Sequence, residues 1–382
     1  MKSKYHVEDY NNCNMAVDMP VVTVIENRFV QKHASLSSLN ADGLFWIILP
    51  QAVLTRLLEE TNLDLSPNNT DVKIGIGLDA CLMPTRFENV SIIQTVDFFY
   101  PLIDDPYTMG QIACANVVSD LYAFGIYEID KIQMILSICD QFSEHEVDVI
   151  TPLIIKGFQD TGKVAGAFVV MQSATINPWC IIGGIATSVC SQKDYINPMN
   201  AQIGDVLVLT KPLGVQIACN VNRWRDNPVK WESVLNAISD EEANTLFDTA
   251  VQNMCRLNKN AAFLMHKYEA HAATDVTGFG ILGHAENLVK FQEQNVKFVI
   301  HSLPFIKNVL SVAEAVNGKK KLLDGRAPET SGGLLICIPK DNADSFCKEI
   351  EEMDKSKAWV IGTVETGTKT VEIVNNVNII ES

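Results

Sequence analysis

The chain has 382 residues, of which 47% are hydrophobic and 20% charged, a composition typical of a soluble globular protein with room for two domains. Its formal net charge of −16 argues against nucleic acid as a partner, because nucleic-acid phosphates are bound by Lys and Arg. No apolar run reaches the roughly 18 residues of a membrane span, and the first residues lack the apolar core of a signal peptide.

The ten cysteines form no C-x-x-C pair and have no regular spacing, and several lie inside apolar runs. Cysteines in such positions behave as small buried hydrophobic side chains. We therefore expect a reducing, cytoplasmic environment. The seven histidines do not cluster along the chain, which argues against a zinc site.

Residues 1–48 show no sustained hydrophobic period, and we expect a flexible leader there. A helix is expected from Pro50 onward, since proline is favoured in the first turn. The run 71–78 predicts a strand that ends at Asp79. Its glycines, Gly75 and Gly77, are unusual inside a strand and often mark the close approach of a ligand.

The stretch from Thr95 to Gly125 carries the densest group of polar side chains. A strand over 90–97 places Asp97 at its end, and an acidic turn then leads into a helix. Asn116 and Asp120 are four residues apart in that helix and therefore share one face. Carboxylates gathered in this way most often hold Mg²⁺. The alternative is a solvated acidic loop followed by a helix N-terminus, where Asp is favoured for its charge alone.

Strands and helices alternate through the rest of the chain, which predicts two α/β or α+β domains. The polar segment 192–204 is expected to link an N-terminal domain, 49–195, to a C-terminal domain, 204–382. The remaining strands are expected at 131–138, 167–171, 180–189, 205–210, 297–301, 334–338 and 358–364, and the remaining helices at 143–165, from about 212, 240–265, 304–316 and 341–351. The tract 274–280 is expected to pass from a strand through a loop into a further helix.

Two further carboxylates, Asp79 and Asp275, lie at strand ends beside glycines. Together with Asp97 and Asp120 they could hold Mg²⁺ while phosphate oxygens complete its coordination, as phosphoryl transfer requires. The chain has neither a Walker motif nor G-x-G-x-x-G in a strand–helix setting. The residues alone therefore indicate a Mg–nucleotide site of an unfamiliar type, with structural Asp residues in turns as the alternative.

Several long tracts resemble selenophosphate synthetase (selenide, water dikinase), and most closely its animal-type members. The likeness extends from about Leu49 to the C-terminus. It implies a two-domain fold shared with aminoimidazole ribonucleotide synthetase, in which the N-terminal domains of a homodimer form a β-barrel. The tracts are GIGLDACLMP, QTVDFFYPLIDDPYTMGQIACANVVSDLYAFG, INPW, GDVLVLTKPLG, ATDVTGFGILGHAENL and PETSGGLL.

The resemblance implies that selenide, ATP and water give selenophosphate, AMP and phosphate with Mg²⁺ as cofactor. The positions that match the family's Mg²⁺ ligands are Asp79, Asp120 and Asp275. The positions that match its ATP site, or lie beside it, are Ile76, Gly77, Leu78, Asp97, Asn116, Asp120, Met171, Gln172 and Ser173.

The chain departs from the family pattern at two places. A glycine-rich loop with a Cys or selenocysteine and a Lys should precede the first helix, but these two positions are Ile47 and Ile48. A Gly-Gly pair should precede INPW, but Met171-Gln172 stands there. One interpretation is an active enzyme with atypical loops. The others are a paralogue that keeps the fold and the dimer without making selenophosphate, related ATP-using chemistry on another substrate, and a sequence whose first 48 residues differ from the natural N-terminus.

Three other features favour structural roles. His284 follows Gly283 in a predicted helix, and we expect a packed or capping histidine. Lys211, at a strand end, is expected either near phosphate or in a solvated loop. The glycines of the segment 330–333 have two possible explanations. They could allow a contact with phosphate, or they could simply form a tight turn before the strand that follows.

Overall fold

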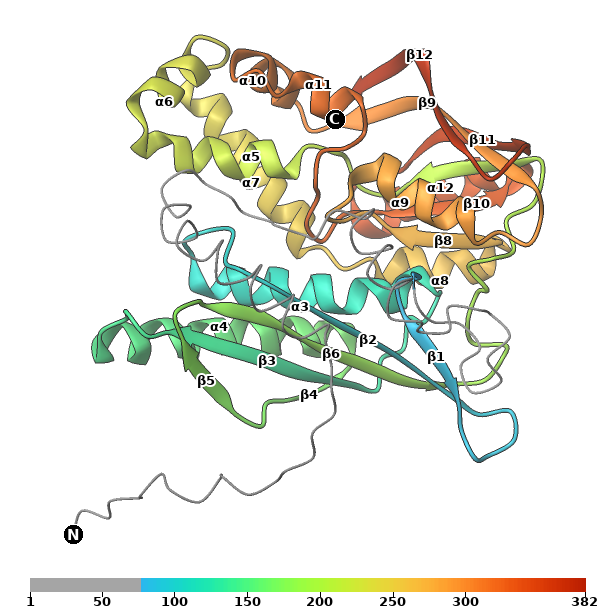
Figure 1. Cartoon of the computed structure of the whole chain (residues 1–382), viewed down its shortest axis with the longest axis horizontal. Helices are drawn as coiled ribbons and strands as arrows, with labels where there is room; N and C mark the ends of the chain where they lie inside the picture. The colour runs from blue at the N-terminus through green and yellow to red at the C-terminus, as the bar shows by residue number, and fades with distance from the viewer. Residues whose placement is uncertain (1–76) are drawn as a thin grey trace, which may run out of the picture. The chain divides into compact units, whose positions relative to one another are not determined.

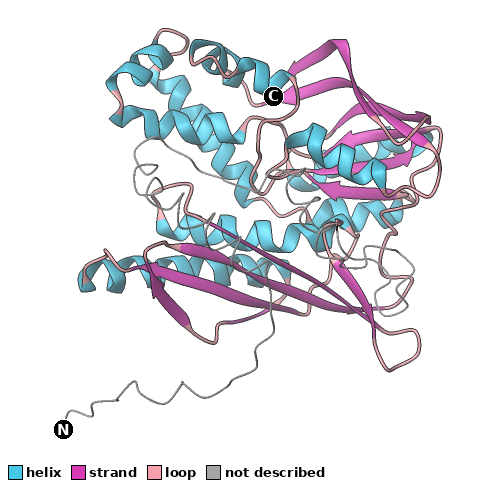
Figure 2. Ribbon diagram, viewed as in Figure 1, coloured by secondary structure: helices cyan, strands magenta, loops and turns pink. Residues whose placement is uncertain are grey.

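The computed structural model describes residues 77–382, which contain two six-stranded sheets and their helices (Figures 1 and 2). The expectations for the leader, for the helix from Pro50, for Ile47, Ile48 and Ile76, and for residues 71–76 lie outside the described residues. Gly77 and Leu78 lie in a turn, so the strand predicted to end at Asp79 is wrong in its last residues, and the first described strand begins after Asp79.

The first sheet has the order β1-β2-β6-β3-β4, and β5 also pairs with β3. Strands β1, β2, β6 and β3 are antiparallel neighbours, whereas β4 and β5 lie parallel to β3. The elements are β1 (Cys81–Pro84), β2 (Ser91–Phe99), α3 (Pro106–Ala123), β3 (Lys131–Cys139), α4 (Glu144–Ala165), β4 (Phe168–Val170), β5 (Ala174–Asn177) and β6 (Ile181–Cys190).

Helices α3 and α4 lie side by side on one face of this sheet, as Figure 1 shows. Asp105 caps α3 by accepting the Thr108 N–H at 2.7 Å, and Pro106 occupies the first turn. The acidic turn is therefore a helix start. Gly110 and Gly157 allow the backbones of the two helices to touch. A Cβ on Gly157 would lie only 1.9 Å from the backbone carbonyl oxygen of Tyr107, so no larger residue fits there. As a result α3 is buried almost all round.

The second sheet has the order β12-β9-β11-β7-β10-β8, and all its pairs are antiparallel except β12 with β9. Its central strand β7 is buried along its whole length, as the apolar run predicts. The elements are β7 (Asp205–Leu209), α5 (Val215–Arg223), η2 (Trp224–Asp226), α6 (Pro228–Leu235), α7 (Asp240–Cys255), α8 (Lys259–Lys267), β8 (Ala272–Asp275), α9 (Gly280–Lys290), β9 (Val296–Phe305), α10 (Val309–Ala315), α11 (Lys319–Leu323), β10 (Leu334–Pro339), α12 (Lys340–Asp354), β11 (Trp359–Thr366) and β12 (Val371–Glu381).

The predicted α/β architecture is confirmed, with several corrections to its elements. The helix expected over 240–265 is two helices, α7 and α8, which are separated at residues 256–258. The helix expected from Pro304 begins at Val309, because β9 continues to Phe305. Strands β1, β5 and β12 were not predicted. The first sheet is open within the described residues, so the dimeric barrel stays a prediction, as do the domain boundaries.

A residue at the break between α7 and α8 connects the two halves of the described chain. Asn258 is 3% exposed, and its amide donates to the Ser119 hydroxyl at 3.0 Å and to the Gly332 carbonyl at 2.8 Å. It thereby ties α3 of the first half to the turn before β10 of the second. No helix in residues 77–382 combines the length and apolar character that crossing a lipid bilayer would require.

Candidate metal and phosphate site

Strand β2 and helix α3 together hold Asp97 and Asp120. Thr95 and Asp97 are two residues apart in β2, so both point toward the face that α3 covers. The Thr95 hydroxyl donates a hydrogen bond to Asp120, and the Asn116 amide donates one to Asp97. The predicted juxtaposition of Asp97, Asn116 and Asp120 is therefore present.

Asn116 also connects this pair of elements to the second half of the described chain. Its carbonyl oxygen accepts the backbone N–H of Ser331 at 2.8 Å, and its side chain is 2% exposed. Ser331 has a φ of +46°, a left-handed conformation in which a non-glycine residue is uncommon. The turn 330–333 is thus fixed by protein contacts beside the carboxylates.

Asp275 and Asp79 contribute two further carboxylates, and these come from β8 and from the residues before β1. Asp275 ends β8 and is 1% exposed, and its Oδ2 atom is buried without a hydrogen-bond partner in the described structure. Asp79, which precedes β1, accepts the Thr274 hydroxyl at 3.0 Å. Neighbouring residues of β8 therefore serve two purposes, because Thr274 orients Asp79 while Asp275 contributes its own carboxylate.

The four carboxylates disfavour one another's charge. Burial and, to a smaller extent, the negative charge of Asp275 together raise the pKa of Asp97 from its ordinary value of 3.8 to about 7. The same two causes raise the pKa of Asp79 and of Asp120 well above the ordinary range. Burial raises the pKa of Asp275 to about 6, an effect that Ser119 and Lys211 oppose. The site would therefore gain stability from a cation.

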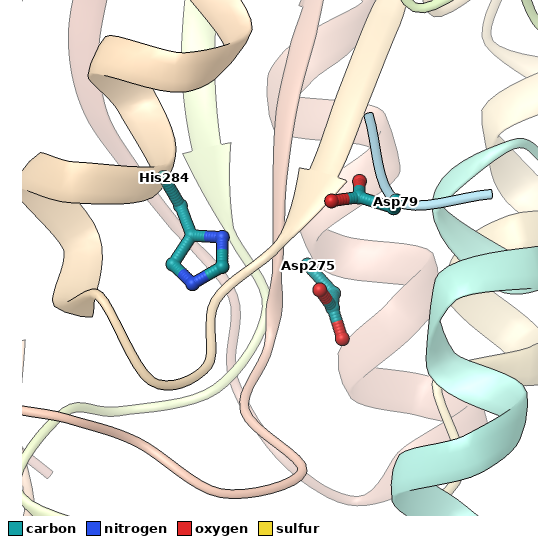
Figure 3. A group of neighbouring side chains, drawn as sticks. All are labelled: Asp79, Asp275 and His284. Atoms are coloured by element: carbon teal, nitrogen blue, oxygen red, sulfur yellow. The ribbon is translucent and has the colours of Figure 1, made fainter. Parts of the chain in front are cut away.

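Figure 3 shows Asp79, Asp275 and His284 facing a common space. One ligand atom from each lies within 4.8 Å of the others, and in the described part of the chain Asp120 falls outside this tighter group. A magnesium ion fits the donor set, because Asp275 offers a buried oxygen without a partner and Mg²⁺ prefers carboxylate oxygens. The assignment of Asp79, Asp120 and Asp275 as its ligands stays a prediction.

Gly77 lies in the turn before Asp79 and has a conformation that favours glycine. Its φ is +93°, and a Cβ there would lie 2.7 Å from the Phe291 ring. Its carbonyl accepts a hydrogen bond from the Asn287 amide. The backbone at Gly77, two residues before Asp79, is thus held against Phe291 and Asn287. The passage of Gly77 and Leu78 beside a ligand stays a prediction.

The predicted segment Met171–Ser173 does not join the carboxylates within one chain. It connects β4 to β5 and is exposed. Asp97 pairs across the sheet with Gly184 and Gly184 with Met134, so β4 is three strands away from β2, roughly 14 Å at the usual strand spacing. A nucleotide role for these residues stays a prediction that the contacts of a single chain do not support.

The structure also adds two threonines that the sequence did not single out, and it places His284 and Lys211 more closely than the sequence did. Thr95 and Thr274 bind the carboxylates through their hydroxyls, and the signal for Thr95 was its two-residue spacing from Asp97. His284, expected to be a packed or capping histidine, accepts the N–H of Phe279 at the start of α9 and also lies within the tighter group. Lys211 is buried rather than solvated. Its Nζ donates hydrogen bonds to the backbone carbonyls of Arg256 and Ser331 at 2.6 and 2.8 Å.

Two family models match the chain. The model for the N-terminal domain of AIR synthase related proteins matches residues 77–184, and the model for their C-terminal domain matches residues 202–375. Together they include the four carboxylates of the site.

Curated relatives match most of the chain. It is 49% identical over 318 residues to selenide, water dikinase 2 of Mus musculus, covering 82% of this chain and 70% of that one. It is 48% identical over 329 residues to selenide, water dikinase 2 of Drosophila melanogaster, covering 84% and 89%. The selenide, water dikinase of Dictyostelium discoideum is 44% identical over 332 residues, covering 87% and 88%.

Solved structures share the fold at low sequence identity. Thiamine monophosphate kinase from Aquifex aeolicus has a TM-score of 0.60 at 18% identity, covering 86% of this chain and 98% of that one. The hydrogenase maturation protein HypE of E. coli has a TM-score of 0.57 at 14% identity, covering 74% and 81%. These structures show the fold alone.

The raised pKa of Asp97 predicts a pH-dependent stability of the metal-free protein. A carboxyl whose pKa is higher when folded stabilises the fold below its unfolded pKa, and this contribution is lost as the pH rises to about 7. We expect Asp97→Asn to raise the free energy of unfolding by about 1–3 kcal/mol at pH 8 and to have little effect at pH 4.

Urea denaturation in EDTA at both pH values measures this difference. Asp148→Asn is the matched control, because it removes one negative charge from an exposed position of α4. A destabilised Asp97→Asn protein at pH 8 would contradict the proposed charge repulsion.

Proposed function

Because the chain belongs to the selenide, water dikinase family, we propose that its carboxylate site binds Mg²⁺ with the phosphates of ATP and that the protein makes selenophosphate. In this reaction selenide, ATP and water give selenophosphate, AMP and phosphate. The observation that carries the proposal is the buried Asp275 oxygen, which has no partner in the described structure and faces other carboxylates whose pKa values are raised.

Each residue of the site has a role in this proposal. Asp79, Asp120 and Asp275 would hold Mg²⁺, which when bound neutralises phosphate charge and orients the reacting phosphoryl group. Asp97 and Asn116 lie beside them, joined by their own hydrogen bond, and would face the nucleotide. Thr95 and Thr274 fix the orientations of Asp120 and Asp79. AaThiL, which has the same fold at a TM-score of 0.61 and 18% identity, was solved with AMPPCP and TMP.

A second candidate function is a paralogue that binds Mg–nucleotide without making selenophosphate. Its support is in the sequence, where Ile47 and Ile48 stand at the positions of the family's Cys and Lys. Ile supplies neither a nucleophilic sulfur nor a cation for phosphate. Met171-Gln172 in place of Gly-Gly supports the same candidate, and the carboxylate site is common to both.

We further propose that the protein is a homodimer and acts in the cytoplasm. The face of the first sheet opposite α3 and α4 exposes apolar side chains of β2, where Val96 is 54% and Phe98 52% exposed. Contiguous exposed apolar surface of this kind marks interaction sites. For the compartment, the support is that buried cysteines such as Cys114, Cys219 and Cys337 are free thiols.

The two candidate functions differ in their products. If the protein is an active dikinase, adding selenide to protein, Mg²⁺ and ATP should produce AMP well above the rate without selenide. AMP at the background rate would overturn the activity and leave the nucleotide-binding paralogue.

The carboxylate site itself is tested by Asp275→Asn. We expect this variant to bind a non-hydrolysable Mg–ATP analogue at least about 100-fold more weakly by calorimetry, because a neutral amide replaces a buried anionic ligand. Asp148→Asn is the control for loss of one charge and should bind as wild type. Equal affinity of Asp275→Asn and wild type would rule out Asp275 as a ligand.

The homodimer is tested by placing a charge on the exposed sheet face. Val96→Glu should convert the dimer to a monomer in sedimentation velocity, because a charge buried in an apolar interface lacks a partner. The far-ultraviolet circular dichroism should stay unchanged, since Val96 points away from the core. Wild-type protein that sediments as a monomer at micromolar concentration would contradict the proposed dimer.

A further inference from the structure

His284 is a buried polar side chain that the carboxylate site does not yet explain. It lies in the first turns of α9 and is 6% exposed. Figure 3 shows its ring beside Asp79 and Asp275, with Nδ1 on the side that faces the two carboxylates. One ring nitrogen lies within 4.8 Å of an oxygen from each of them.

The hydrogen bonds of the ring define its tautomer. The backbone N–H of Phe279 donates to Nε2 at 3.3 Å, so Nε2 carries a lone pair and no proton. The Thr277 hydroxyl also lies 3.2 Å from Nε2. A neutral imidazole has one N–H, which must therefore be on Nδ1.

Nδ1 itself has no hydrogen-bond partner in the described residues and is buried. A buried donor without a partner is costly, and native structures normally satisfy such groups with protein, water or a ligand. The donor is turned toward carboxylates that carry their own unpartnered oxygen, Oδ2 of Asp275. Within residues 77–382, no acceptor forms a hydrogen bond with Nδ1 on the side of the carboxylates.

We propose that the Nδ1–H of His284 donates a hydrogen bond to an oxygen atom coordinated to the divalent cation at Asp79 and Asp275, either a bound water or a phosphate oxygen. His284 is then a positioning residue rather than a metal ligand, because the proton on Nδ1 occupies the lone pair that a metal would need. The inference rests on the proposed function, since it requires a cation at the carboxylates.

In this arrangement the loop before α9 orients the His284 ring. Phe279 holds Nε2 and so selects the tautomer, and the tautomer in turn directs a donor into the site. Residues that orient the groups around a metal in this way commonly change its affinity 10–100-fold when they are replaced.

Two substitutions separate this role from a purely structural one. An Asn amide nitrogen occupies the position of Nδ1, whereas a Gln amide reaches the position of Nε2. His284→Asn therefore keeps the donor toward the site and loses the acceptor for Phe279, and His284→Gln does the reverse. Calorimetric titrations with Mg²⁺ alone and with Mg²⁺ plus a non-hydrolysable ATP analogue measure both variants.

We expect His284→Gln to bind about 10-fold or more weakly and His284→Asn to stay within about 3-fold of wild type. Weaker binding of Mg²⁺ alone identifies a bound water as the acceptor, and weaker binding only with the analogue identifies a phosphate oxygen. Wild-type affinity in His284→Gln, or a loss confined to His284→Asn, would overturn the proposal.

A measurement on the wild-type protein covers the case in which a variant fails to fold. The ¹⁵N shifts of His284 should show the proton on Nδ1, and the Nδ1 resonance should move on addition of Mg²⁺ or the Mg²⁺–nucleotide analogue. A proton on Nε2, or no response to either, would overturn the proposal. Wild-type protein that binds neither ligand would overturn the proposed function as well, whereas normal binding with an unaffected His284 overturns this inference alone.

Discussion

The repulsion among carboxylates around Asp275 is the constraint on which the rest of the site depends. Burial raises the pKa of Asp79, Asp97 and Asp120, and the charge of Asp275, which is itself almost fully buried, raises each of them as well. Lys211 lowers the pKa of Asp275, but burial also lowers the pKa of Lys211 well below its ordinary value. A cation bound between the carboxylates would relieve this repulsion, which is why the arrangement favours a metal site over a structural cluster.

The fold keeps these charges together by joining both halves of the described chain at the same place. Asn116 binds Asp97 with its amide and the Ser331 backbone with its carbonyl. Asn258 binds Ser119, which precedes Asp120, and the Gly332 carbonyl. Two buried amides therefore set how β2 and α3 meet the turn before β10. Shifting either contact would change the distances between carboxylates as well as the packing.

Much of this arrangement follows from the sequence by simple rules. The four-residue spacing of Asn116 and Asp120 and the position of Asp97 at a strand end predicted their common orientation, and α3 and β2 have it. Gly77 predicted a close approach of other groups, and its φ and the Phe291 ring explain the need for glycine. The family resemblance, which the comparisons confirm, added the fold.

The sequence was least informative where long-range contacts decide the local structure. Nothing in the apolar pattern of 240–265 marks the break at 256–258, where Asn258 reaches Ser119 and Gly332. The role of His284 depends on a hydrogen bond from Phe279 and on the distance to Asp79, which lies far away in sequence. Resemblance was also an incomplete guide for Met171–Ser173. This segment was assigned to the nucleotide site by resemblance, but within a single chain it lies three strands away from β2 and the carboxylates.

The most direct test of the account is the position of a bound metal. Crystals grown with Mn²⁺ in place of Mg²⁺ and a non-hydrolysable ATP analogue would give an anomalous peak that marks the ion. We expect this peak within about 2.3 Å of carboxylate oxygens from Asp79, Asp120 and Asp275, with phosphate oxygens in the remaining positions. A nucleotide bound without metal at these residues, or a peak elsewhere on the protein, would contradict it.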